Sequence, residues 1–543
     1  MEKKYIHESR YKKGTTRKRR DARTVRSNIN SKAKTQVDKQ IKPNVKKTKK
    51  TVKKAKRENK TTNIIFCIIL LILIAVISRA ILKDENEPFI PLPFIKNSND
   101  QVIKIGVITE ESLLQEDTNN VVLNELYKYY KEMLLTINDD YSITYGVISN
   151  VNKISNKEYV IYIDLESKML VEELMQVFNK CKANTESSYY LKFQNIESMT
   201  VVNNNALNIK LKEDDPYFVY CLEMQISKET NTNNSNYIKD VTSTEDMLVL
   251  NRNKKADKEL PLKLIIKRYK DVYAIVDAYK SRDINMFVTN AENVETLLGR
   301  YEYNITRYRN GQSVFLFASP SSKLFSLKEV RQAIAYSIDR DKIIQDVFES
   351  KGLKIDLPYI YDDVKYKYDI YAAENLLLTN GYKKSNNVYS KIEKGVKTTL
   401  ELDLIVNKND ETKVSIAKAI KNNLTAIGIK VNLEQLTEKK LQSRIQKNDY
   451  DLVVASVNLN KNPDINFVSN NLFITNQMEQ AIKNIENSTI QELSKNINNI
   501  QKIMSEEIAT IGIYSDVSYL VYSKDIIGLK NVSYMNLFKG IIG

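Results

Sequence analysis

Histidine is almost absent from this 543-residue chain, whose only histidine is His7. General-base catalysis by imidazole, Ser/His/Asp triads and histidine metal clusters are therefore excluded from everything that follows it. No nucleophile motif is present. Paired carboxylates such as Asp214 and Asp215 are not accompanied by residues that would complete a catalytic site. We therefore predict that the chain is not an enzyme and that it uses neither a metal nor a cofactor.

Cysteine is scarce too, with only Cys67, Cys181 and Cys221. The three show no CxxC spacing, so they form no zinc site by themselves. Two interpretations of Cys181 and Cys221 stay open, a disulfide formed outside the cell and two buried free thiols. We favour the free thiols.

Acidic residues are rare at the N-terminus, where residues 1–62 hold 24 Lys and Arg against 5 Asp and Glu, whereas the remainder holds 59 against 62. The net charge of +16 thus belongs to a tail and not to a folded domain. Because this tail has almost no apolar content, we predict that 1–62 is disordered. We expect it to set membrane topology and to contact anionic lipids. Contact with nucleic acid is the less favoured alternative.

One long apolar run follows the tail, at 64–82, with Arg79 as its single charge near the end. At about 1.5 Å per residue this run spans roughly 28 Å, close to the hydrocarbon thickness of a bilayer. The basic residues before it place the N-terminus in the cytoplasm and the rest outside. We predict an uncleaved signal anchor rather than a cleaved signal peptide, because the basic region before the run is too long. The proline-containing segment 84–100 is predicted to be a linker.

Patterns of both strands and helices follow. VIKIGVI at 102–108 alternates apolar residues as a strand does. Ser326 and Glu329 have the spacing of a capping box, with Ser326 at the N-cap. The apolar residues after Ser326 predict one helical face, formed by Leu327, Val330, Ile334 and Ile338.

A strand, a helix and a strand are predicted in succession at 400–434. LELDLIV at 400–406 is the first strand and IKVNLE at 429–434 the second. The helix between them ends at Gly428, a residue suited to a left-handed C′ position. This order predicts a parallel pair of strands with a right-handed crossover, in an α/β lobe.

Four passages resemble family 5 of the extracellular solute-binding proteins, the group with the oligopeptide-, dipeptide- and nickel-binding components of ABC importers. In chain order they are LKEVRQAIAYSIDRDKII at 327–344, YDIYAAENLLLTNGY at 368–382, AIKNNLTAIGIKVNLE at 419–434 and NDYDLVVASVNLNKNPDINF at 448–467. In the first of them we expect Asp339, Arg340 and Asp341 to be cap and salt-bridge residues rather than ligand contacts.

The earlier half is similar to the same family at 124–148, 158–178 and 197–222. The resemblance implies an α/β, periplasmic-binding-protein-like ectodomain of the two-lobed, cluster C type, whose lobes are hinged by crossing strands and close on a ligand. We expect the first lobe at 101–305, the second at 306–505, and a return to the first lobe at 506–543.

The resemblance also implies the ligand-binding residues Val457, Asn458, Asn460, Asp464 and Ala318. Where the family has an aspartate that pairs with the ligand's α-amino group, this chain has Asn460. An amide supplies no charge, so peptides with a free N-terminus should bind weakly unless Asp464 or another acid substitutes. The family's cleft tryptophan falls at Val457, and its strand-ending asparagine falls at Ala318.

The expected function is delivery of a peptide or another small polar solute to the permease subunits of an ABC transporter. The expected location is the cell membrane, with one span, a cytoplasmic N-terminus and a large extracytoplasmic domain. The alternative is a diverged sensor or interaction protein that has lost peptide binding, which the missing cleft residues favour.

Overall fold

The computed structural model describes residues 101–115, 117–167, 169–226, 238–253, 261–357, 364–458, 461–463 and 473–540. The predicted basic tail, apolar span and linker lie outside the described residues. In the part of the chain that is described, no helix is long and apolar enough to cross a membrane. All described residues belong to one compact unit, Pro93–Gly543.

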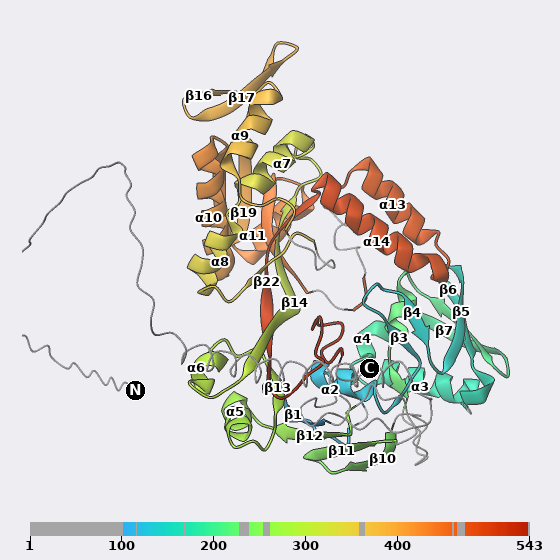
Figure 1. Cartoon of the computed structure of the whole chain (residues 1–543). Helices are drawn as coiled ribbons and strands as arrows, with labels where there is room; N and C mark the ends of the chain where they lie inside the picture. The colour runs from blue at the N-terminus through green and yellow to red at the C-terminus, as the bar shows by residue number, and fades with distance from the viewer. Residues whose placement is uncertain are drawn as a thin grey trace, which may run out of the picture. The chain divides into compact units, whose positions relative to one another are not determined.

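One mixed sheet of eleven strands runs through the described residues (Figure 1). Its order is β10-β11-β12-β1-β13-β22-β14-β21-β19-β20, and β15 pairs with β22 in addition. The strands are β1 (Val102–Ile108), β10 (Ile238–Ser243), β11 (Met247–Arg252), β12 (Lys263–Tyr269), β13 (Met286–Thr289), β14 (Asn304–Ala318), β15 (Leu353–Lys354), β19 (Glu401–Asn407), β20 (Lys430–Leu436), β21 (Leu452–Asn458) and β22 (Thr510–Tyr522).

Two long antiparallel strands, β14 and β22, join the two halves of this sheet. They pair from Asn304 opposite Tyr522 to Phe317 opposite Thr510. At one end β22 also pairs with β13, and at the other β14 also pairs with β21. The ladder shifts register between Arg309 and Ser313. The predicted α/β class with lobes joined by crossing strands is thereby confirmed.

The first-lobe core surrounds β1 and a second sheet, of order β5-β6-β8-β7. The strands outside the large sheet here are β2 (Glu132–Met133), β3 (Leu135–Ile137), β4 (Ile143–Tyr145), β5 (Ile148–Ser155), β6 (Glu158–Ile163), β7 (Ile196–Asn203), β8 (Ala206–Leu211) and β9 (Gln225–Ile226). The helices are α2 (Val121–Tyr127), η2 (Leu165–Ser167), α3 (Val171–Ala183), α4 (Tyr190–Phe193), η3 (Phe218–Leu222), α5 (Val272–Lys280) and α6 (Val294–Leu298).

Helices α13 (Asn476–Glu486) and α14 (Ile490–Glu507) pack against this first-lobe core, beside the second sheet (Figure 1). The Ser494 hydroxyl donates to the Asp140 carbonyl at 2.7 Å, and the Lys153 ammonium donates to the Glu486 carbonyl at 2.6 Å. The sequence prediction assigned these helices to the second lobe, because it ended that lobe at 505. We propose instead that the second lobe ends before α13.

The second-lobe core forms around β14, β19, β20 and β21. Its helices are α7 (Lys328–Ser337), α8 (Arg340–Phe348), α9 (Ile370–Thr379), α10 (Glu411–Ile427) and α11 (Glu438–Gln446), and a small sheet comprises β16 (Lys383–Ser385), β17 (Val388–Glu393) and β18 (Val396–Thr399). The predicted crossover is confirmed: β19 and β20 are parallel, with α10 between them in sequence. Gly428 ends α10 with φ of 102°, a left-handed conformation that favours glycine.

The predicted capping box at the start of α7 is wrong. The helix has Leu327 at its N-cap and no side-chain cap, and the Ser326 hydroxyl donates to the Lys323 carbonyl at 2.6 Å instead. The physical reason is the turn before the helix, in which the Ser326 amide already donates to the Ser322 carbonyl. This turn places Ser326 one residue too early to cap.

Candidate functional site

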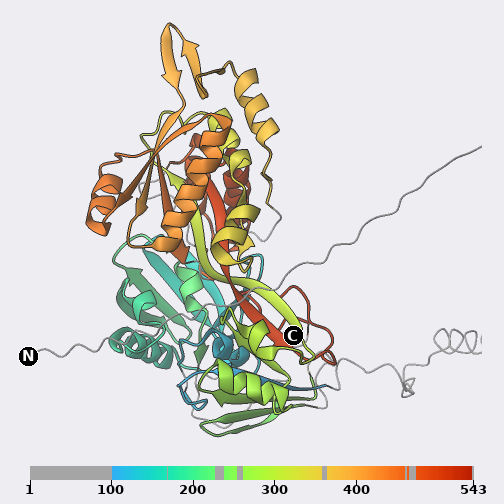
Figure 2. The same ribbon diagram turned by 90° about the vertical axis from the view of Figure 1, so that its left-hand side faces the viewer.

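A cavity of about 380 Å³ lies where first-lobe elements meet the chain that follows β21. The first lobe lines it with residues of α2, η3 and α4, the last contributing Lys192, and with residues beside these elements. The strand β14 contributes Asn310, beside its register shift, and the chain after β21 contributes Lys461 and Asn462. The cavity thus collects residues from both joined parts of the fold. Figure 2 gives a second view of these elements.

Four charged side chains meet in this cavity: Glu125, Lys128, Glu223 and Lys461. The Lys128 ammonium lies 3.2 Å from the Glu125 carboxylate and 2.9 Å from the Glu223 carboxylate. The Lys461 ammonium forms an ion pair with Glu125 and lies 3.8 Å from the Glu223 carboxylate. The exposed fractions of the side chains are 2% for Glu125, 11% for Glu223, 13% for Lys128 and 20% for Lys461. Each carboxylate therefore has two ammonium partners, and the cluster is neutral as a whole.

Local structure explains how the first-lobe members of the cluster are positioned. The side chain of Asn120 caps α2 by accepting from the amides of Val122 and Leu123 at 3.0 and 3.1 Å. Glu125 lies on the buried part of this short helix, and Lys128 follows one turn later. Glu223 follows η3, all of whose residues are buried, and its carboxylate accepts from a backbone amide of β3 at 3.1 Å.

The electrostatics of the cluster are set by burial and by its opposite charges. Burial alone would raise the pKa of Glu223, but Lys461 and Lys128 outweigh it and lower that pKa below its ordinary value. Burial would likewise lower the pKa of Lys128, yet Glu125 and Glu223 raise it. These two shifts favour the charged forms of Glu223 and Lys128, whereas burial lowers the pKa of Lys461 in spite of its carboxylate partners.

Apart from Lys192, the rest of the cavity is lined by uncharged residues, several of them able to form hydrogen bonds. The Asn124 side-chain amide donates to the Thr118 carbonyl at 2.9 Å, whereas its Oδ1 atom is buried and accepts no hydrogen bond from the described residues. Asn310 and Gln225 also line the cavity. The side-chain amides of Asn310 and Gln225 are groups that both donate and accept hydrogen bonds.

The predicted site residues fall in three places. Val457 and Asn458 lie at the end of β21, where Val457 is half-buried and Asn458 is exposed. Asn460 and Asp464 lie outside the described residues. Ala318 is buried, with 1% exposed, and pairs with Leu452 at the opposite end of the same ladder. The structure therefore does not bring Ala318 together with Asn458.

Sequence reasoning missed all four charges of the cluster. Glu125 and Lys461 are 336 residues apart, so no local pattern connects them. A weak signal was available at Lys461, which directly follows the predicted ligand residue Asn460. As predicted, no disulfide joins Cys181 and Cys221; Cys221 is buried and lines the cavity, whereas Cys181 is half-buried rather than buried. In the described part of the chain, no group of three or more His, Cys, Asp or Glu side chains is arranged to hold a metal ion.

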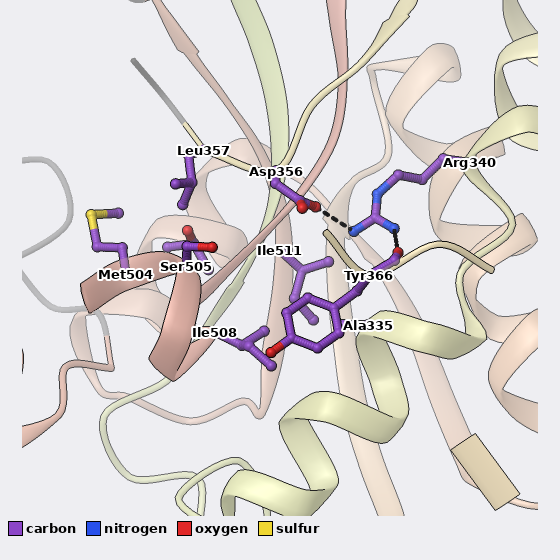
Figure 3. Close-up of a pocket in the computed structure, with 10 residues that line it drawn as sticks. Ala335, Arg340, Asp356, Leu357, Tyr366, Met504, Ser505, Ile508 and Ile511 are labelled. Carbon is purple, nitrogen blue, oxygen red and sulfur yellow. Dashed lines mark hydrogen bonds and ion pairs between the residues drawn. The ribbon is translucent and has the colours of Figure 1, made fainter. Parts of the chain in front are cut away.

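A second, much smaller cavity lies where the second-lobe core meets the end of α14 (Figure 3). Its volume of about 10 Å³ has room for roughly one water molecule. Arg340 at its wall pairs with Asp356 at 3.2 Å and donates to the Tyr366 carbonyl at 2.9 Å. Asp339 caps α8, and Asp341 pairs with Lys354 at 2.8 Å. The predicted roles as cap and salt-bridge residues are confirmed.

The chain matches the family model of bacterial extracellular solute-binding proteins, family 5, over residues 171–479, which is more than half of its length. It is 23% identical over 252 residues to the oligopeptide-binding protein AppA of Bacillus subtilis, covering 44% of this chain and 45% of that protein. It is 22% identical over 258 residues to a probable D,D-dipeptide-binding periplasmic protein, DdpA, of Escherichia coli, covering 44% and 47%. The chain thus matches about half the length of these curated relatives.

Two solved structures have similar folds. One is the periplasmic murein tripeptide binding protein MppA in its unliganded open form, with a TM-score of 0.58 and 16% identity, covering 81% of this chain and 95% of that one. The other is a nickel ABC transporter protein from Bacillus halodurans, with a TM-score of 0.58 and 15% identity, covering 81% and 99%. At these identities the likeness establishes the fold alone, a mixed α/β fold of two lobes.

Proposed function

Because this chain belongs to family 5 of the bacterial extracellular solute-binding proteins, we propose that it binds a peptide or another small polar solute and delivers it to the permease of an ABC importer. Proteins of this family bind substrates for import and are not enzymes. The solute is held in the cavity lined by Glu125, Glu223 and Lys461.

The cavity is the observation that carries the proposal. Its volume of about 380 Å³ falls within the usual range for small-molecule sites, about 300–1,000 Å³. Its walls come from first-lobe elements, from the crossing strand β14 and from the chain after β21. Among the described strands, only the pair β14 and β22 connects the two halves of the large sheet. A small conformational change near the register shift of this pair would therefore open or close the cavity.

The predicted site residues extend this proposal. Val457 and Asn458 end the strand that leads to Lys461, and Asn460 and Asp464 are its neighbours in sequence. We include these four in the proposed site. Ala318 stays outside it, because it is buried in the second-lobe core at the other end of the ladder.

The location of the protein is part of the same proposal. The apolar run at 64–82 anchors the chain in the cell membrane as a single span, with the basic residues 1–62 in the cytoplasm against anionic lipids. The solute-binding domain then lies outside the cytoplasm, as the family's extracellular character requires.

A second candidate function has one specific observation in its favour. The buried carboxylates of Glu125 and Glu223 are already paired within the chain, by Lys128 and Lys461. A sensor or interaction protein that has lost peptide binding would have such a cavity, in which the charged side chains pair with one another.

A thermal-shift screen of the full chain in mild detergent tests the proposal. The ligands are short free peptides, N-acetylated peptides and metal chelates. Binding to the folded state raises the melting temperature, with about 2.7 kcal/mol of added stability at a hundredfold excess over the dissociation constant. If no ligand produces a shift, the transport proposal fails and the sensor function is favoured.

A pair of exposed apolar residues supplies a matched control for the location of the site. Val121 lines the cavity and is 56% exposed, whereas Leu114 is 51% exposed and does not line it. Val121→Trp should fill part of the cavity and abolish the ligand-induced shift, while Leu114→Trp should leave it unchanged. Equal effects of the two substitutions would contradict binding in this cavity.

A further inference from the structure

Lys461 brings an ammonium group of the chain itself into the cavity. It follows β21 of the second lobe, whereas its partners Glu125 and Glu223 belong to the first lobe. The Glu125 side chain is only 2% exposed and pairs with both Lys461 and Lys128. Two buried carboxylates at the wall of a cavity form a subsite for a cation, and here a residue of the protein fills it.

We infer that Lys461 occupies the cation subsite of this cavity, so that the solute it accepts carries no free ammonium group, as in an N-acylated peptide. This inference rests on the proposed function, because it specifies the class of solute for the same site. Lys461 is then a specificity-determining residue of the receptor.

The argument for exclusion of cationic solutes is one of competition. A solute ammonium reaches Glu125 and Glu223 only by displacing Lys461, which is part of the same chain and therefore present at a high effective concentration. Displacement also leaves the Lys461 ammonium without its carboxylates in a partly buried place. A solute without an ammonium group meets neither cost.

The remaining walls are compatible with a solute that has no ammonium group. Asn124 lines the cavity, but its Oδ1 atom is buried away from the cavity space. Asn310 and Gln225 add groups that both donate and accept. The four charges of the cluster cancel, and Lys192 adds one more ammonium group at the cavity wall, which further disfavours a cationic solute.

The first experiment removes the tethered cation and supplies a free one. Lys461→Ala leaves a space that matches propylammonium, which replaces the lost carbons and the nitrogen. In the full chain, propylammonium chloride should bind this variant at least about tenfold more tightly than it binds the wild type, measured by the shift in melting temperature. The neutral analogue 1-propanol should not do so, with ionic strength matched by sodium chloride.

Two matched variants separate a cation subsite from a simple cavity. In Lys461→Ala combined with Glu125→Gln, one carboxylate is lost with the cation, so propylammonium should bind no better than to the wild type. Lys351 also contacts two carboxylates, those of Glu292 and Glu349, but on the surface. Lys351→Ala should therefore gain no propylammonium binding.

The second experiment compares two peptides that differ in the ammonium group alone, trialanine amide and N-acetyl-trialanine amide. The wild type should prefer the acetylated peptide, and Lys461→Gln should shift the ratio of dissociation constants toward the free amine by at least about tenfold. The glutamine keeps a polar side chain of similar length, so this variant decides the matter if the alanine variant does not fold.

The outcomes distinguish the inference from the proposed function. If the wild type binds peptides, but propylammonium does not favour Lys461→Ala and the peptide ratio is unchanged in Lys461→Gln, the inference is overturned and the proposed function stands. If propylammonium binds Lys461→Ala specifically while no variant binds either peptide, the cation subsite is supported and the peptide-type function is overturned. Equal affinity of the wild type for both peptides would overturn the assigned solute class.

Discussion

Two regions of this molecule bury charge, and they do so in different ways. In the cavity cluster, Glu125, Lys128, Glu223 and Lys461 are satisfied mainly by one another, beside a space of about 380 Å³. In the second lobe, the buried Arg340 contacts two backbone carbonyls as well as a carboxylate, beside a space of about 10 Å³ (Figure 3).

The arginine region is closed because its partners are fixed. Arg340 donates to the carbonyls of Gly512 and Tyr366 at 2.7 and 2.9 Å, and Arg331 donates to those of Phe325, Ser326 and Glu507 at 3.0, 2.8 and 2.7 Å. A backbone carbonyl has no other position to adopt, so these bonds hold elements together. The carboxylates and ammonium groups of the cavity cluster belong to movable side chains, which a ligand can rearrange. We therefore assign stability to the first kind of site and binding to the second.

The largest effect on stability is expected from Arg340→Met. This substitution leaves the Asp356 carboxylate and two carbonyls without their shared partner in a buried place, which should lower the free energy of unfolding by about 3–5 kcal/mol. Arg307→Met is the control, since Arg307 is 39% exposed and pairs with Glu295 on the surface, and it should cost at most about 1 kcal/mol. Urea unfolding measures both. Equal costs would remove the distinction between fixed and surface arginines.

A smaller effect is expected from Lys461→Gln. Loss of one charged hydrogen-bond partner of Glu125 should cost about 1.5–3 kcal/mol, measured as above. The double variant with Glu125→Gln should recover part of this loss, because it removes the carboxylate left with fewer partners. Strictly additive costs in this double-mutant cycle would mean that Lys461 and Glu125 do not interact, and would undermine the proposed subsite.

The two regions should also differ in their response to acid. The pKa of Glu223 is lowered in the folded state, so its contribution to stability is present above the unfolded value of about 4.3 and is lost as the pH falls through the folded value. Glu223→Gln should therefore destabilise the protein at pH 7, and the difference from the wild type should shrink on acidification below about pH 4. Unfolding curves recorded across this pH range measure the difference in the free energy of unfolding between Glu223→Gln and the wild type. A difference that stays constant with pH would contradict the assignment.

The sequence predicted the parts of the fold that depend on neighbouring residues. The crossover of β19, α10 and β20 follows from local apolar spacing and from Gly428, and the structure confirms it. Asp339 caps its helix as expected. In each case the residues that decide the structure lie within a few positions of one another, where helical and strand periodicity are visible.

The sequence did not predict the parts that depend on distant residues. Lys461 looks like a solvated lysine in its own passage, and only folding brings Glu125, 336 residues away, into contact with it. The same holds for α13 and α14, whose apolar faces are plain in sequence but whose packing partner is the first-lobe core. An amphipathic pattern indicates that a face is buried and does not indicate against what.

The smallest effect concerns the start of α7 in the closed region. Arg331 holds the carbonyls of Phe325 and Ser326 there, and the exposed Ser326 hydroxyl does not cap the helix. Ser326→Ala should therefore change the free energy of unfolding by no more than about 0.5 kcal/mol. Asp369 caps α9 by accepting from the Ala372 amide at 2.9 Å, so Asp369→Ala should cost about 1 kcal/mol. If Ser326→Ala lowered the free energy of unfolding as much as Asp369→Ala, the Ser326 hydroxyl rather than the Arg331 guanidinium would order this turn. The closed region would then depend on exchangeable side-chain contacts, as the cavity does.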